Sequence, residues 1–308
     1  CKVRHIAYST FSILQLFHDG RAYLVEFDNP ACIFIRNGKL MDIPYEIREI
    51  AGKTVRESKF DIALGDMFAM VSDGVVFAGV GAILNLGWQW ENVAQFFLEC
   101  AQKKMSVHRV VASVAQVVDN FYMGKPGDDS TFLVAQAVPR KNVHFFSGPP
   151  VDKAKDEEII RDFMRGSCKK IVAGGTSANI AARVLGRKIV TNLNFTDPAI
   201  PPTAQIRGID LVTEGVLTIN RALEILRKFC EQNGEVDLKE LDADNGAAQM
   251  ARMLIEDCTD LTMFIGKAIN PAHQNPNLPM DLSIKMRLLN ELADVMRKMG
   301  RRVEVNFY

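Results

Sequence analysis

The sequence lacks the features that mark several large classes of protein. Its 308 residues carry 37 basic and 37 acidic side chains, so the formal net charge is zero. A chain without excess charge has no electrostatic preference for nucleic acid or an anionic membrane surface. The longest apolar run, residues 75–84, is too short to cross a bilayer, which needs about 20 residues. No signal peptide pattern is visible at the start. We therefore expect no nucleic-acid partner and no membrane association.

Cysteine is scarce and scattered, and none of the six cysteines forms a C-x-x-C pair. A zinc knuckle or a thioredoxin-like redox motif is therefore not expected. Isolated cysteines in apolar surroundings are typical of reduced, buried thiols, which favours a cytoplasmic protein. The first residue is Cys1 rather than methionine, and it leads directly into a strand-like segment. We interpret the chain as a fragment or a processed product.

The length predicts two domains, because single hydrophobic cores rarely grow beyond about 250–300 residues. A short Gly/Pro cluster at residues 147–150 is the predicted linker, which gives domains at 1–147 and 151–308. The first half is rich in strand-like runs and then shows two amphipathic helical stretches, at 90–104 and 107–121. The second half alternates strands with helices, which predicts a smaller α/β domain with a mostly parallel sheet.

Two acidic motifs are the most informative feature of the first half. Ser72-Asp73-Gly74 closes an apolar strand, and Gly127-Asp128-Asp129-Ser130-Thr131 opens another. Carboxylates at the ends of buried strands suit hard divalent cations, which prefer oxygen ligands. Adjacent aspartates also repel each other unless a cation or a hydrogen-bond donor compensates. The alternative is that both motifs are simple turns, since Asp and Gly are ordinary turn residues.

The two motifs, in this order, resemble those of the metal-dependent Ser/Thr protein phosphatases (PPM type), specifically the sporulation stage II E (SpoIIE) subfamily. The resemblance covers roughly residues 1–137, and segments 8–13 and 26–31 are similar to central strands of that family. It implies an α+β fold, a β-sandwich flanked by helices. By matching position, Asp73 and Asp128 would be direct ligands in a site for two Mn²⁺ or Mg²⁺ ions. Asp129 would bind a metal through water or support a ligand.

The same resemblance implies an activity and a partner. The enzyme would hydrolyse phosphoserine or phosphothreonine on a bacterial signalling phosphoprotein, such as an anti-anti-sigma-like domain, by metal-activated water. The family's first metal motif should lie before Tyr8, yet none of the seven preceding residues is acidic. We therefore expect the activity of this chain to be impaired.

Two other hypotheses follow from the same observation. In one, the chain is a catalytically silent regulatory or binding protein whose second domain binds a small anionic ligand. In the other, strand edges left unpaired by the missing segment favour pairing with a second copy, because an open edge presents free backbone donors and acceptors. We therefore expect a homodimer.

The second half contains one glycine-rich turn between a strand and a helix. Its residues are Gly174, Gly175, Thr176, Ser177 and Asn179. Backbone N–H groups at a helix N-terminus can hold an anion, and glycines allow its close approach. The alternative is that Thr176 or Ser177 is simply an N-cap.

Polar residues follow two further predicted strands. Glu214 ends one of them, and Asn270 and His273 follow the other. Because the carboxyl ends of parallel strands lie at one edge of a sheet, these side chains are candidate ligand contacts beside the glycine turn. His273 could equally be a hydrogen-bonding loop residue. Thr218 is the expected N-cap of the next helix.

Overall fold

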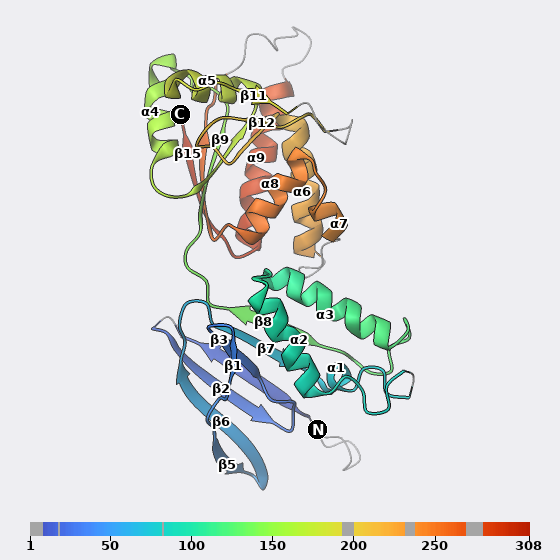
Figure 1. The fold of residues 1–308 in the computed structure, drawn as a ribbon. Coiled ribbons are helices and arrows are strands. Elements are labelled where there is room, and N and C mark those ends of the chain that lie inside the picture. The colour runs from blue at the N-terminus through green and yellow to red at the C-terminus, as the bar shows by residue number, and fades with distance from the viewer. Residues whose placement is uncertain (1–8, 18, 82, 193–199, 232–237, 269–279) are drawn as a thin grey trace. The chain divides into compact units, whose positions relative to one another are not determined.

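The computed structural model describes residues 9–17, 19–81, 83–192, 200–231, 238–268 and 280–308, without the side chains of residues 280–283. The chain divides into two compact units, Cys1–Pro139 and Arg140–Tyr308 (Figure 1). Strand β9 (Asn142–Ser147), which the sequence analysis placed before the linker, pairs with strands of the second unit. No helix in the described part of the chain is long and apolar enough to cross a membrane.

The first unit contains two antiparallel four-stranded sheets. In spatial order, one consists of β1 (Phe11–Leu16), β2 (Arg21–Phe27), β6 (Lys53–Asp61) and β5 (Glu46–Ile50), and the other of β4 (Lys39–Met41), β3 (Ile33–Arg36), β7 (Met67–Val71) and β8 (Phe132–Gln136). Leu24, Phe34 and Phe68 form a buried core between the sheets, where the rings of Phe34 and Phe68 stack at 4.8 Å. Alternate residues along β2 are buried, as the period of a strand requires.

Helices cover the opposite face of the sheet that contains β3 and β7. They are α2 (Trp90–Gln102) and α3 (Val107–Phe121), both close to the predicted ranges, and the short α1 (Asp73–Val76) precedes them (Figure 1). Phe97 and Val110 are fully buried against strand residues such as Ile33. The helices form because their apolar residues recur with a helical period. The unit therefore has three layers: one sheet, the second sheet and a layer of helices.

Strands β4, β5 and β6 were not predicted from the sequence. All five residues of β5 are exposed, so this edge strand lacks the alternation of buried and exposed residues that marks a strand. Tight turns connect the missed strands, with Asn37 and Ala51 at φ of 52° and 50°. The hairpins are held by backbone pairing to their neighbours, which composition does not reveal.

The second unit is built on a seven-stranded sheet that is mostly parallel, as predicted, but the unit, Arg140–Tyr308, is longer than the first and not smaller. Its spatial order is β11 (Val190–Thr191), β12 (Ala204–Gln205), β13 (Leu211–Thr213), β10 (Lys169–Ala173), β9, β14 (Asp260–Ile265) and β15 (Arg302–Phe307). The five strands from β13 to β15 run parallel, and β12 pairs antiparallel with both of its neighbours, β11 and β13. The first strand of the second unit, β9, lies between later strands on both sides, which is the arrangement of doubly wound α/β folds.

Helices cover both faces of this sheet. The helices α6 (Val216–Glu231), α8 (Gly246–Glu256) and α9 (Met280–Lys298) pack on one face, and α4 (Asp156–Met164) and α5 (Gly175–Leu185) pack on the other (Figure 1). A 3₁₀ turn, η1 (Lys153–Lys155), precedes α4. Neighbouring strand residues divide between the faces: Phe145 belongs to the first core and Phe146 to the second. This alternation is why the strands read as continuous apolar runs.

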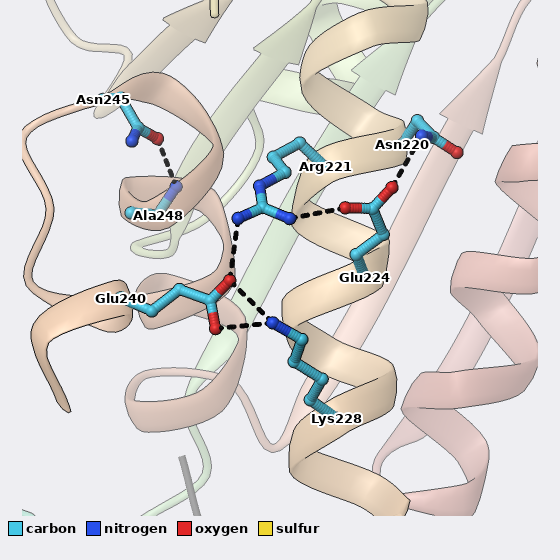
Figure 2. Close-up of polar contacts among 7 residues, drawn as sticks. All are labelled: Asn220, Arg221, Glu224, Lys228, Glu240, Asn245 and Ala248. Carbon is cyan, nitrogen blue, oxygen red and sulfur yellow. Dashed lines mark hydrogen bonds and ion pairs between the residues drawn. The ribbon is translucent and has the colours of Figure 1, made fainter. Parts of the chain in front are cut away.

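Polar contacts hold the short helix α7 (Leu238–Leu241) beside α6 (Figure 2). Glu240 accepts hydrogen bonds from Arg221 at 2.9 Å and from Lys228 at 3.1 Å. Asn245 caps α8 by accepting the N–H of Ala248 at 2.9 Å. These charged groups are partly exposed, so they orient α7 more than they stabilise it.

Two helix starts differ from the predictions. Thr218 lies inside α6 rather than at its N-cap, because the helix begins at Val216. The N-cap of α5 is Gly174, at φ 119°, and not Thr176 or Ser177. Helix α5 ends at Leu185, and the glycine that follows it, Gly186, adopts the left-handed conformation at φ 62°.

Candidate functional site

The two acidic motifs of the first unit lie on adjacent loops. Strands β7 and β8 pair with Val71 opposite Phe132, so the loop after β7 meets the loop before β8. The hydroxyl of Ser72 accepts the N–H of Thr131 at 2.8 Å and donates to the carbonyl oxygen of Asp129 at 3.1 Å. Strand pairing thus brings the loop that carries Asp73 beside the loop that carries Asp128.

Gly74 is required by the close contact between these loops. A Cβ atom at this position would lie 2.5 Å from the carbonyl oxygen of Asp129. Tyr122, at the end of α3, makes a second connection. Its hydroxyl donates to the carbonyl oxygen of Gly74 at 2.7 Å, and its ring lies 3.2 Å from the Cβ position of Gly127. One side chain therefore touches both carboxylate-bearing loops.

The carboxylates themselves are exposed and bonded locally. Asp73 accepts the N–H of Gly74 at 3.0 Å, and Asp128 accepts the N–H of Asp129 at 2.8 Å. In the part of the chain that the structure describes, no three His, Cys, Asp or Glu side chains gather closely enough to hold a metal ion. Exposed carboxylates on touching loops have the oxygen chemistry that Mn²⁺ or Mg²⁺ prefers, so these residues fit as part of a ligand set.

A buried ion pair that the sequence did not reveal anchors the other end of β7. Asp66 is 1% exposed and receives the Arg36 guanidinium in two hydrogen bonds, of 2.9 and 2.6 Å. It also accepts the N–H of Ala63 at 2.7 Å. Burial raises the pKa of Asp66, but the bonds from Arg36 and Ala63 outweigh it and hold the pKa below its ordinary value. The pair fixes the start of the strand that ends at Ser72-Asp73.

The glycine turn of the second unit lies at the carboxyl end of β10, as expected. Gly174 donates its N–H to the carbonyl oxygen of Thr213 at 2.9 Å, and Glu214 Oε1 lies 3.7 Å from the Cβ position of Gly175. The structure therefore brings Gly174, Gly175 and Glu214 together. Thr176 and Asn179 are exposed on the first two turns of α5.

Ser177 has a different environment from that expected of a ligand contact. It is 1% exposed, and its hydroxyl accepts the N–H of Gly148 at 2.7 Å. This bond connects α5 to the end of β9. Asn270 and His273, the remaining predicted contacts, lie outside the described residues.

Comparisons with known proteins give a partial structural likeness. No family model matches the sequence, and no curated protein matches it. The structure is similar to the phosphatase domain of the cell fate determinant SpoIIE from Bacillus subtilis, with 18% identity and a TM-score of 0.32 over 43% of this chain and 60% of that one. A form of that domain presoaked with Mn gives 15% identity and a TM-score of 0.33, over 44% of this chain and 59% of that one.

A structure of a different protein matches a comparable share of this chain. The RsbU and RsbW domains of a Mycobacterium tuberculosis protein match with 14% identity and a TM-score of 0.33, over 53% of this chain and 46% of that one. The chain thus spans less than two thirds of each of these structures. TM-scores of 0.32 and 0.33 do not by themselves identify a fold or an activity.

Proposed function

We propose that the first unit is a metal-dependent protein phosphatase of the PPM type, acting on phosphoserine or phosphothreonine in a signalling protein. The observation that carries the proposal is the contact between the two acidic loops. Ser72 bonds both to Asp129 and to Thr131, and Gly74 packs on the same loop. Simple turns need no such mutual fit, whereas a shared cation site requires its ligands to be held together.

Each residue of the site would have its own role. Asp73 and Asp128 provide carboxylate oxygens on the two loops, and Asp129 supports them from the next position. Tyr122 and Ser72 hold the loops in register through the hydrogen bonds described above. Divalent ions, when bound, would supply water activation and charge neutralisation at the phosphoryl group. This division needs no protein nucleophile.

Manganese binding is the most direct test, because it can be measured without turnover. We expect Mn²⁺ to broaden the backbone amide NMR signals of residues 72–74 and 127–131 selectively. Asp73→Asn and Asp128→Asn should abolish this broadening, because each removes a charged ligand. Asp42→Asn, which changes an exposed aspartate elsewhere in the first unit, should leave it intact.

Hydrolysis of a phosphoserine peptide with and without Mn²⁺ then tests the activity. Manganese-dependent turnover that disappears in Asp73→Asn but persists in Asp42→Asn supports the proposal. Absence of selective broadening in the unmodified chain would refute metal binding at these loops. Binding without turnover would support a metal site at these loops and refute the catalytic part of the proposal.

A further inference from the structure

A lysine that the sequence analysis did not single out lies at the carboxyl edge of the second unit's sheet. Lys285, in α9, places its Nζ atom 3.0 Å from the Cβ position of Gly148, the residue that follows β9. The side chain is partly buried, and this burial lowers the pKa of the Lys285 amine to about 8. Within the described residues no hydrogen bond or ion pair compensates its charge.

The backbone around this amine is unusually close-packed. A Cβ atom on Gly148 would lie 2.4 Å from the carbonyl oxygen of Gly266, and one on Gly266 would lie 2.1 Å from that of Pro149. The N–H of Ala268 continues the pairing by donating to Pro149 at 3.0 Å. Glycines are therefore required after both β9 and β14, and the absence of a side chain at Gly148 leaves room for the Lys285 ammonium.

The topology places this point where a doubly wound sheet binds ligands. The helix after β9, α4, covers one face of the sheet, and α9, which follows β14, covers the other. Strands β9 and β14 are neighbours. Adjacent strands whose connections leave in opposite directions mark the switch point, beyond whose carboxyl ends ligands bind in such folds.

Helix α5 also contacts the residue beside the Lys285 amine. Gly148 donates its N–H to the hydroxyl of Ser177, in the first turn of α5, at 2.7 Å. The first N–H groups of a helix have no acceptors within it and carry partial positive charge. A single ammonium beside such a helix start and glycine backbone suits a phosphate group, which accepts bonds in several directions.

We propose that this edge of the sheet binds the phosphate group of a small molecule, with the Lys285 ammonium as its charged contact and the start of α5 beside it. Glu214 places a negative charge near Gly175, at the other glycine of the α5 start. The phosphate therefore belongs on the Gly148 side, and Glu214 faces the less charged part of the ligand. The site is separate from Asp73 and Asp128, and it stands whether or not the first unit is a phosphatase.

The test uses calorimetric titration of the full chain in EDTA, which removes any contribution from a metal site in the first unit. The probes are inorganic phosphate and adenosine 5′-monophosphate at constant ionic strength. We expect Lys285→Met to weaken binding at least tenfold and Lys285→Arg to retain most of it. Lys188→Met, which changes an exposed lysine near the other end of α5, should have no effect. Tighter binding of the nucleotide would identify a phosphorylated metabolite, and equal binding would identify phosphate itself.

Two outcomes would overturn the proposal: no binding of either probe, or unchanged binding in Lys285→Met. Stability gives an independent readout. A buried cation kept for a ligand is unfavourable without it, so Lys285→Met should not lower, and should even raise, the melting temperature of the ligand-free chain. A purely structural ion pair would instead make this variant less stable. If Lys285→Met does not fold, limited acetylation of the unmodified chain tests the proposal instead. Phosphate should then slow the acetylation of Lys285 but not that of Lys188, and equal rates with and without phosphate would refute the proposal.

Discussion

Removing the carboxylate of Asp66 should destabilise the first unit more than any exposed charge change. Asp66→Ala takes away the acceptor of two Arg36 bonds and of the Ala63 N–H. Breaking a fully buried pair from one side costs about 3–5 kcal/mol. Here the Asp66 side chain is 2% exposed, but that of Arg36 is 32% exposed and can regain water. We therefore expect the free energy of unfolding to fall by about 2–3 kcal/mol.

The assay is urea unfolding followed by tryptophan fluorescence. Both tryptophans, Trp88 and Trp90, lie in the first unit, so their signal reports on that unit alone. Asp19→Ala is the matched control, because Asp19 pairs with Arg21 at 2.7 Å but both side chains are more than half exposed. This control should leave the unfolding midpoint almost unchanged.

A double-mutant cycle with Arg36→Met isolates the pair from other contacts of the arginine. Arg36 also donates to the carbonyl oxygen of Asp61 at 2.8 Å and lies over the Phe34 ring, so its own substitution removes more than the ion pair. The pH dependence is a further check. Since the folded pKa of Asp66 is lowered from 3.8, its contribution is complete above about pH 4 and is lost as the pH falls through the folded pKa. An Asp66→Ala variant as stable as Asp19→Ala would refute the reasoning.

Three further predictions test other parts of the structure. Tyr122→Phe removes the hydroxyl that donates to Gly74 and should cost about 1 kcal/mol by tryptophan fluorescence, whereas Tyr45→Phe, at a 55% exposed tyrosine, should cost nothing measurable. Gly266→Ala places a Cβ atom 2.1 Å from the carbonyl oxygen of Pro149 and should destabilise the second unit by about 1–3 kcal/mol in circular dichroism, whereas Gly175→Ala, with its nearest contact at 3.7 Å, should be tolerated. Burial lowers the pKa of His144, so its contribution is present above the ordinary value of 6.5 and is lost as the pH falls through the folded pKa; His144→Gln should flatten the decline of stability between pH 7.5 and 5.5.

The elements with strong periodicity were predicted well from the sequence. The ranges of α2 and α3 agree with the structure to within two residues at each end, because their apolar residues repeat with the period of a helix. Strand β7 also ends where the sequence places the end of an apolar strand, just before Ser72. Strand β9 was missed even though its residues are mostly buried. A short run between turns carries no period by which strand can be distinguished from loop.

The candidate sites also combine residues that the sequence suggested with residues that only the structure revealed. The sequence suggested the aspartates of the first unit, from their position and a family resemblance, and the glycine turn of the second, and both sites stay predictions. It could not identify Tyr122, Asp66 or Lys285 as partners, because each acts through residues distant in the chain: Gly74, Arg36 and Gly148. Such contacts depend on which strands become neighbours.

The sequence by itself determined the local elements: where apolar residues repeat, where glycine and proline interrupt, and where carboxylates follow a strand. Those properties depend on neighbours within a few residues. Only the tertiary structure decided that β7 lies beside β8 and β9 beside β14, and these two pairings create both candidate sites. The reason is physical: strand pairing buries apolar faces and satisfies backbone hydrogen bonds over the whole sheet, so its outcome depends on all strands at once.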